Sequence, residues 1–260
     1  MQKIIFTTFF KDIGRDKWAS FNRSTDLYVD RFLRLATAIE YDLNVYVDKS
    51  LLDFLSNHLK DNSNVKIIDI DEVDSTYDHF YEKDLQIIKS KSYLEKIPNH
   101  RRENPEHKFA EYNAVMNSKI SFIENTYRLS PDYDFYAWID FGILQNKDTD
   151  EDIIPKFLNL KKIPFGVTYG IQNFPDTKMS FIEMLKSDVI YFDGSSFVVH
   201  KFSFSSFYSA WQDKVREMHD SFITDDDQNL VLQIYQSNPH LFNLISCEWF
   251  HLFHSFKDNA

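Results

Sequence analysis

The fold is decided by the stretch Tyr136-Ala-Trp-Ile-Asp-Phe-Gly142, an apolar run that ends in one carboxylate and, two residues later, a glycine. Together with Phe135, this run predicts a largely buried strand that has Asp140 at its C-terminal end. Open α/β sheets bind their ligands at that end of the strands. Asp140 is therefore a candidate ligand-binding residue, although its position alone is equally typical of an aspartate that caps a turn.

Toward the N-terminus, the sequence alternates strands and helices. Residues 3–10, 44–47 and 65–70 are short apolar runs that predict strands, and apolar residues at helical spacing lie between them. Such alternation predicts parallel strands joined by right-handed crossovers. The turn after the first strand contains Gly14, whose backbone freedom suits a loop that faces a nucleotide.

Toward the C-terminus the pattern is less regular. Residues 71–105 indicate an irregular or partly helical insertion, and residues 106–125 predict one amphipathic helix with Lys119 at the edge of its apolar face. Asp193 and Gly194 have a strong turn preference and are expected to join two strands. The remaining predicted elements are strands over residues 165–169, 188–192 and 196–200, and helices over residues 202–218 and from Thr224, a suitable N-cap, to near Pro239.

Length and composition favour one soluble α/β domain over two small domains that share a cleft. The 260 residues are 43% hydrophobic and 27% charged, which argues against disorder. A net charge of −11 argues against a nucleic-acid partner, because proteins that bind nucleic acids usually carry a basic face. The 25 Phe and 14 Tyr fit either a coding bias or aromatic surfaces that stack on sugar rings.

The expected compartment follows from cysteine usage and hydropathy. A single cysteine, Cys247, excludes an intrachain disulfide and fits a reducing environment. The first residues are too short and polar-flanked for a signal peptide, and no run of about 18 apolar residues is present. A cytoplasmic protein, at most peripheral to the inner face of a membrane, is expected.

A run of three carboxylates, from Asp225 to Asp227, opens the last predicted helix. The helix dipole stabilises carboxylates in a first turn, so a structural role is as consistent with the pattern as a catalytic one. Three in succession exceed what capping requires. In the catalytic interpretation Asp226 or Asp227 accepts a proton from a substrate hydroxyl as general base, and Gln228 hydrogen-bonds a sugar hydroxyl.

Basic side chains and histidines are the remaining candidates for binding a diphosphate or a metal. Lys119 is the first candidate for neutralising a diphosphate, and the weaker candidates are Arg15, Arg101 and Arg102. Alternatively, the Lys119 side chain extends along its helix toward solvent. His251 lies three residues before a second histidine, a spacing that suits one helical face. It would supply a metal ligand unless both histidines are simply packed among the apolar residues around them.

Several enzyme classes lack their sequence motifs. The chain contains no HExxH, GxSxG or GxxxxGK[ST], so it shows no sign of a zinc protease, an α/β-hydrolase or a P-loop enzyme. No GxGxxG follows the first strand, which argues against a dinucleotide-dependent dehydrogenase.

Several segments together resemble the HtrL/YibB family of bacterial proteins, which are related to glycosyltransferases of surface-polysaccharide and lipopolysaccharide assembly. The matching segments are Phe9-Phe-Lys-Asp-Ile-Gly-Arg15 with Trp18, residues 113–119 and, most specifically, Trp138-Ile-Asp-Phe-Gly142. Asp193-Gly194 and residues 226–228 extend the resemblance to most of the chain.

The resemblance implies a GT-A-like fold, a single domain over residues 1–260 with a central, mostly parallel Rossmann-like sheet flanked by helices. Its nucleotide-binding half would cover residues 1–145 and its acceptor-binding half residues 146–260. Asp140 would take the place of the metal-binding DXD motif and hold Mn²⁺ or Mg²⁺. Because Gly142 occupies the second acidic position, metal binding would require another ligand, such as His251.

The same resemblance implies the other site residues. The nucleotide and diphosphate would be bound by the end of the first strand and the loop after it, and Asp226 or Asp227 would act as base. The expected nucleotide-binding residues are Thr7, Thr8, Phe9, Arg15, Lys119 and Asp140, and the expected sugar-binding or acceptor-binding residues are Asn113, Asp193, Gly194 and Gln228.

The activity that the resemblance implies is glycosyl transfer. A hexose of galactose or N-acetylhexosamine type would move, with the assistance of a metal, from a UDP-sugar to a saccharide or lipid-linked saccharide acceptor of a surface glycan. An aspartate base from the run 225–227 implies inversion at the anomeric carbon. Two alternatives remain open: a non-catalytic module that binds saccharides or nucleotide-sugars, and a hydrolase that uses water as the acceptor.

Overall fold

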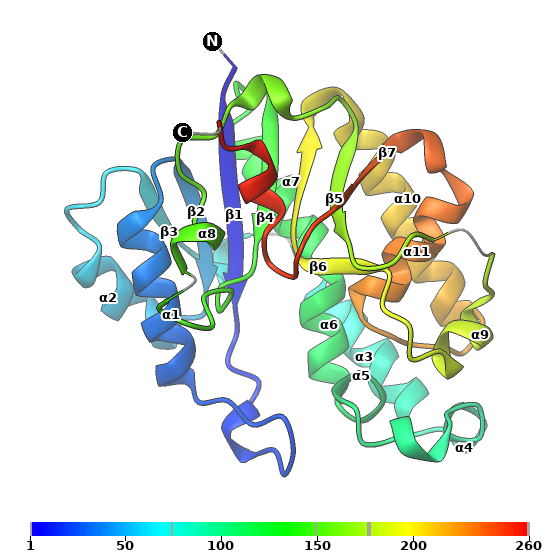
Figure 1. Ribbon diagram of the computed structural model, residues 1–260. Helices are drawn as coiled ribbons and strands as arrows, with labels where there is room; N and C mark the ends of the chain where they lie inside the picture. The colour runs from blue at the N-terminus through cyan, green and yellow to red at the C-terminus, as the bar shows by residue number, and fades with distance from the viewer. Residues whose placement is uncertain (1, 74, 149, 176–177, 259–260) are drawn as a thin grey trace.

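The protein is built around one seven-stranded sheet, seen in a computed structural model that describes residues 2–73, 75–148, 150–175 and 178–258 (Figure 1). The strands are β1 (Ile4–Phe10), β2 (Asp42–Val47), β3 (Val65–Asp69), β4 (Phe135–Ile139), β5 (Val167–Ile171), β6 (Phe192–His200) and β7 (Phe242–Ser246). They are ordered β3-β2-β1-β4-β6-β5-β7. Only β6 runs antiparallel to its neighbours, β4 and β5, among the described strands. The predicted α/β class with a mostly parallel sheet is confirmed.

Helices cover both faces of this sheet. The α-helices are α1 (Thr25–Ala38), α2 (Lys49–His58), α3 (Tyr77–Ile88), α4 (Lys91–Leu94), α5 (Pro105–Lys108), α6 (Ala110–Asn117), α7 (Lys119–Leu129), α8 (Asp150–Ile153), α9 (Phe181–Lys186), α10 (Lys201–Asp220) and α11 (Asp227–Ser237). Apolar residues of α1, α2 and the 3₁₀ helix Leu252–Phe256 form the core on one face. Residues of α3, α6, α7, α10 and α11 form the core on the other face.

The first strands are where the sequence predicts them, because each carries side chains for both cores. In β1, Ile4 and Phe6 pack on the α1 side, whereas Ile5 and Phe9 pack on the α7 side. A strand that is buried on both faces reads as a continuous apolar run, and all seven residues of β1 are buried. The predicted strand before Asp140 is confirmed for the same reason: every residue of β4 is buried between β1 and β6.

The single helix predicted over residues 106–125 is wrong. The segment forms α5, α6 and α7, with breaks at Phe109 and Ser118. Phe109 has an extended backbone and its ring stacks on that of Trp18, 3.8 Å away between centroids. Near Ser118, the carbonyl of Asn117 accepts a hydrogen bond from the indole of Trp211 at 2.9 Å. Tertiary partners therefore interrupt a pattern that is helical by spacing.

The turn predicted at Asp193 and Gly194 is also wrong. Both residues lie inside β6, which runs without interruption from Phe192 to His200 between β4 and β5. Strand pairing before and after these two residues, of Phe192 with Ile171 and of Ser196 with Ile139, overrides the local turn preference. The last long helix begins at Asp227 with Asp226 as its N-cap, so Thr224 is not the cap, and its hydroxyl donates to Asp84 instead. Strand β7 was not predicted.

The insertion predicted at residues 71–105 is partly helical, which is one of the two forms that the sequence predicts. It contains the twelve-residue helix α3 and the short helix α4. Within the residues that the structure covers, no helix combines the length and the apolar character needed to cross a membrane.

Candidate active site

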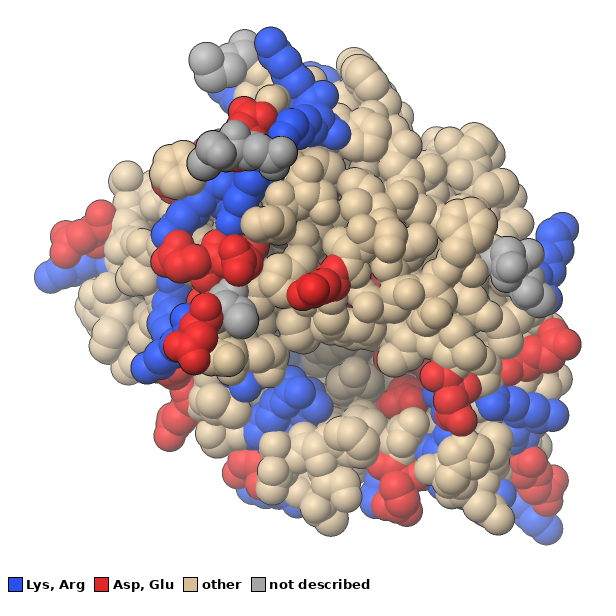
Figure 2. All heavy atoms as spheres, in the orientation of Figure 1, with Lys and Arg blue, Asp and Glu red and all other residues tan. Residues whose placement is uncertain are grey.

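A cavity of about 310 Å³ lies at the C-terminal ends of β1 and β4. Its wall is formed by the loop after β1, the segment after β4, the start of β6, the start of α11 and the C-terminal segment at Trp249. Figure 2 shows this face of the molecule hollowed below its centre, with basic side chains on one side of the hollow and acidic ones on the other. The cavity is at the sheet edge where the sequence predicts ligand binding.

Asp140 projects into the cavity directly after β4. Its backbone N–H donates to the carbonyl of Ser195 at 2.9 Å, which continues the pairing of β4 with β6. Its Oδ1 accepts a hydrogen bond from the indole Nε1 of Trp138 at 2.7 Å. The side chain is 34% exposed, and no hydrogen bond from the described residues reaches Oδ2. Asp140 therefore has one oriented oxygen and one oxygen available to a ligand.

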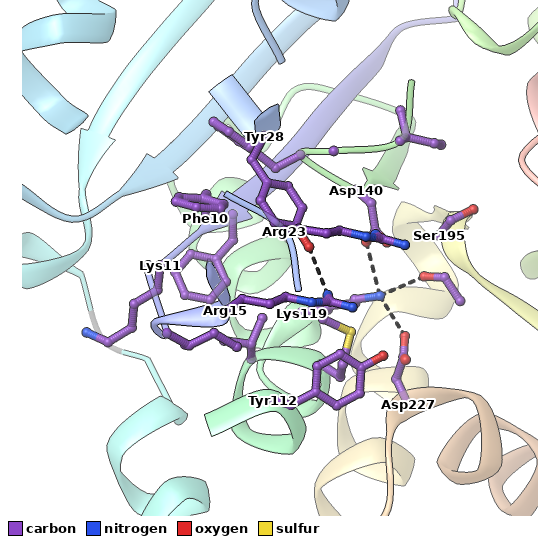
Figure 3. A pocket seen from close by; sticks show the side chains of 18 of the residues that line it. Phe10, Lys11, Arg15, Arg23, Tyr28, Tyr112, Lys119, Asp140, Ser195 and Asp227 are labelled. Atoms are coloured by element: carbon purple, nitrogen blue, oxygen red, sulfur yellow. Dashed lines mark hydrogen bonds and ion pairs between the residues drawn. The ribbon is translucent and has the colours of Figure 1, made fainter. Parts of the chain in front are cut away.

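Lys119 is the most buried charged group of the site. Its Nζ lies 3.1 Å from Oδ1 of Asp140, 2.8 Å from Oδ2 of Asp227 and 2.7 Å from the carbonyl oxygen of Gly194 (Figure 3). Burial alone lowers the pKa of this ammonium, but the two carboxylates outweigh burial and raise the pKa above its usual value. Lys119 is therefore a permanent cation and is not the solvent-directed side chain that helical spacing allows.

Asp227 opens α11 beside this ammonium. Burial raises the pKa of its carboxyl to about 6, and the attraction of Lys119 limits that rise. The dipole of α11 also favours a carboxylate at this first helical position. Asp227 is therefore anionic at neutral pH, with a pKa close enough to neutrality for proton transfer.

Two glycines allow the close approaches in the site. A Cβ on Gly194 would lie 2.8 Å from Oδ2 of Asp227, so only glycine lets α11 come this near to β6. A Cβ on Gly142 would lie 2.5 Å from Cδ1 of the Tyr28 ring. Tyr28 therefore fills the space that a side chain at position 142 would need.

The loop between β1 and α1 supplies the cationic side of the cavity. The Arg15 guanidinium donates to the carbonyl of Phe21 at 2.9 Å and to the hydroxyl of Tyr28 at 2.8 Å. Arg23 lines the same cavity, and none of the described residues forms a hydrogen bond or ion pair with its guanidinium. In Figure 3 both arginines extend into the cavity in front of Lys119 and Asp140. Arg15 is thus fixed, whereas Arg23 is available to an anion.

Several predicted residues support the site from outside the cavity lining. Thr7 and Thr8 are buried in β1, and the Thr7 hydroxyl bonds to that of Thr126 at 2.9 Å. Asn113 donates to the Glu106 carbonyl and to the Thr224 hydroxyl, so it fastens α6 to the segment before α11.

Asp193 holds the C-terminal segment in place. It accepts hydrogen bonds from the backbone N–H groups of Ser195 at 2.9 Å and Phe250 at 2.7 Å. Both of its oxygens are occupied in this way, and burial raises the pKa of its carboxyl. Phe250 and its neighbour Trp249 line the cavity, so Asp193 positions one of its walls.

The other predicted residues divide between the cavity and its surroundings. Phe9 and Gln228 line the cavity. Asp226 does not, and its side chain caps α11 by accepting from the backbone N–H of Gln228 at 3.1 Å. His251 also lies outside the lining, with Nδ1 2.8 Å from the Trp249 carbonyl. Arg101 is buried against Glu106, away from the cavity.

Sequence reasoning missed four residues that define the site. Arg23 and Tyr28 belong to no recognisable sequence motif. The strand pattern predicts Trp138 only as a core residue. Asn117 donates to the Asp225 carbonyl at 3.0 Å and so helps to fix the start of α11. Its only sequence signal is its spacing of four residues from Asn113, which places both amides on one face of α6.

The donor set fits a divalent cation poorly. Oδ1 of Asp140 already accepts from Trp138 and Lys119, and the ammonium would repel a second cation. The Tyr28 ring occupies the space of a second acid at position 142. No group of three or more His, Cys, Asp or Glu side chains suited to a metal occurs in the described part of the chain.

The chain is similar to several known proteins. It is 25% identical to Protein HtrL of Escherichia coli (strain K12), over 98% of this chain and 93% of that one. Among solved structures, mouse xyloside xylosyltransferase 1 matches with a TM-score of 0.46 and 10% identity, over 99% of this chain and 94% of that one. The galactosyltransferase LgtC, solved with donor and acceptor sugar analogs, matches with a TM-score of 0.40 and 10% identity, over 92% of this chain and 72% of that one.

The match to a family model covers almost the whole chain. That family is described as a bacterial protein of unknown function (HtrL_YibB), and its model matches residues 2–258. The chain therefore belongs to the HtrL/YibB family.

Proposed function

We propose that this protein is a glycosyltransferase that moves a hexosyl group from a UDP-sugar to a hydroxyl of a saccharide acceptor. The observation that carries this proposal is the pairing, within one cavity, of a cationic loop that bears Arg15 and Arg23 with the two carboxylates Asp140 and Asp227. Such a cavity can hold an anionic leaving group on one side and a proton-accepting group on the other.

The cationic loop is the proposed binding site of the donor diphosphate. Arginine binds phosphate oxygens through two parallel N–H groups, and its charge balances the negative charge that accumulates on a departing diphosphate. Arg15 is held for this task by Tyr28, and its guanidinium also lies 5.2 Å from the ring centroid of Trp18. The rings of Tyr28, Tyr112 and Trp249 line the cavity and offer surfaces for the base and the sugars.

Asp227 is the proposed general base. The acceptor oxygen forms a bond to the anomeric carbon while the bond from that carbon to the diphosphate oxygen breaks. The hydroxyl proton moves to the Asp227 carboxylate, and UDP leaves with the electron pair. Attack from the side opposite to the leaving group inverts the anomeric configuration. The pKa of about 6 keeps Asp227 deprotonated and able to accept this proton at neutral pH.

The proposed sugar is a hexose of galactose or N-acetylhexosamine type, and the proposed acceptor is a saccharide or lipid-linked saccharide of a surface glycan. These identities rest on the family resemblance of the sequence. Asp140 has an oxygen free to accept a hydrogen bond from a hydroxyl of the donor sugar.

The test is a panel of UDP-sugars incubated with mono- and oligosaccharide acceptors, with free UDP and glycan products measured separately. We expect UDP release that requires an acceptor and yields an extended glycan. UDP release at the same rate without any acceptor, and without a glycan product, would identify a hydrolase instead. Tight binding of a UDP-sugar with no turnover on any acceptor would identify a binding module.

A further inference from the structure

The ammonium of Lys119 lies between the two carboxylates of the cavity. An ammonium has three N–H donors, and those of Lys119 face Asp140, Asp227 and the Gly194 carbonyl. All three are thus used by the protein, and no donor is left for a substrate. Lys119 is only 1% exposed. Removing an ammonium from water costs several kcal/mol unless it is well paired, so this triad is a built arrangement and not a chance surface contact.

The same arrangement occupies the position that a divalent cation would need. A cation ligated by Asp140 and Asp227 together would lie where Nζ of Lys119 lies. An acidic side chain at position 142 could not assist it, because Tyr28 closes the space next to Gly142. Asp140 retains a single oxygen without a protein donor, so a cation held there would take most of its ligands from substrate phosphates and water.

The cavity does not need a metal to attract an anion. Its lining carries four cationic and three acidic side chains, which gives it a net positive charge. The cations are Lys11, Arg15, Arg23 and Lys119, and the acids are Asp12, Asp140 and Asp227. Lys119 offsets one of the two carboxylate charges that it contacts, and Arg15 and Arg23 supply positive charge for the diphosphate.

We propose that Lys119 takes the place of the divalent cation, so that this site binds a nucleoside diphosphate on Arg15 and Arg23 without any metal. This inference rests on the proposed function for the identity of the ligand. Its second part, that Lys119 excludes a metal from the Asp140–Asp227 pair, concerns the protein alone.

The first experiment is calorimetric titration of the wild-type protein with UDP, in EDTA and in Mn²⁺. We expect dissociation constants that agree within about twofold. Binding that is about tenfold tighter or more in Mn²⁺ would overturn the inference and leave the proposed function standing. If UDP bound in neither solution, the proposed function would fail, and the metal measurement below would still decide the role of Lys119.

The second experiment titrates Mn²⁺ into the protein without nucleotide and follows the paramagnetic resonance signal of free Mn²⁺. The wild-type protein should leave the signal unchanged. Lys119→Ala opens the space between Asp140 and Asp227 and should bind one Mn²⁺, so the free signal should fall. The double variant Lys119→Ala/Asp227→Asn lacks one carboxylate and should bind at least about tenfold more weakly than the single variant.

Two results contradict this role for Lys119. One is stoichiometric Mn²⁺ binding by the wild-type protein that Asp140→Asn abolishes. The other is a correctly folded Lys119→Ala protein, judged by circular dichroism, that binds no more Mn²⁺ than the wild type. Even if Lys119→Ala fails to fold, the titration of the wild-type protein still shows whether the Asp140–Asp227 pair binds Mn²⁺.

Discussion

Lys119 donates to the Asp227 carboxylate at 2.8 Å and thereby joins the first residue of α7 to the first residue of α11, 108 positions later in the chain. The two residues differ in how well they suit a helix start. A carboxylate at this position is stabilised by the helix dipole, whereas an ammonium is destabilised. Lys119 therefore lies where local helix energetics disfavour it, and its position is explained by the carboxylates that it contacts.

Replacing the proposed base should separate catalysis from binding. Asp227→Asn removes the proton acceptor but keeps the size of the side chain, so glycosyl transfer should fall by about 10²–10⁴-fold. The dissociation constant of UDP should change little, because the diphosphate is assigned to the arginines. Asp226→Asn is the matched control, since asparagine is an equally good N-cap and Asp226 does not line the cavity. Equal losses in both variants would show that neither effect comes from the cavity.

The available guanidinium of Arg23 should contribute directly to donor binding. Arg23→Ala should weaken UDP binding by about 10- to 100-fold, the range expected when a charge-assisted hydrogen bond is lost. The comparison variant is Arg216→Ala, which removes an arginine that pairs with Asp213 on α10, outside the cavity lining. Calorimetry at two salt concentrations should show a weaker salt dependence for Arg23→Ala only. If Arg23→Ala binds UDP as tightly as the wild type, the diphosphate is not on this loop.

Gly142 should be intolerant of any side chain, because the Tyr28 ring lies against it. A Cβ at this position would meet the ring carbon Cδ1 at 2.5 Å, so Gly142→Ala should lower the free energy of unfolding by about 1–3 kcal/mol. Tyr28→Ala removes the ring, and in the double variant the alanine at position 142 should cost little. Denaturant unfolding of the four proteins gives the coupling energy. Additive losses would show that the two residues are not in contact.

The buried imidazole of His107 should make stability depend on pH. Burial lowers its pKa to about 4, although Glu106 acts in the opposite direction, and Nδ1 lies 2.9 Å from the hydroxyl of Tyr93. Arg101 is the other charged group that acts on this imidazole, and it lowers the pKa further. In the unfolded chain this imidazole has the ordinary histidine pKa of about 6.5, so stability should be lost as the pH falls from about 6.5 to about 4, by up to about 3 kcal/mol.

The comparison that isolates this group is His107→Gln, which keeps a polar side chain opposite Tyr93 but does not titrate. The difference in unfolding free energy between the wild type and this variant should vary between pH 6.5 and pH 4 and be constant above that window. A difference that does not vary with pH would show that His107 is not buried in its neutral form.

The sequence predicts elements well where local pattern and tertiary environment agree. Strands β1, β2 and β4 are buried over almost their whole length, so each is visible as an apolar run. The edge strand β3 is only partly buried, but Val65, Ile67 and Ile68 still mark it in the sequence. The sequence predicts poorly where a distant partner overrides the pattern. The Asp193-Gly194 pair favours a turn locally but lies within β6, because Phe192 pairs with β5 before it, Ser196 pairs with β4 after it, and Asp227 packs against Gly194.

The sequence by itself determined that this chain forms a mostly parallel α/β sheet with Asp140 at the ligand-binding edge, because hydrophobic periodicity is a local property that neighbouring residues carry together. Only the tertiary structure decided what Asp140 faces. Arg23, Lys119 and Asp227 come from three separate segments, and their charges acquire a function only when the folded chain places them around one cavity. The buried position of Lys119 between two carboxylates is such a property, since its energy comes from contacts across 21 and 108 positions of sequence, which no local pattern records.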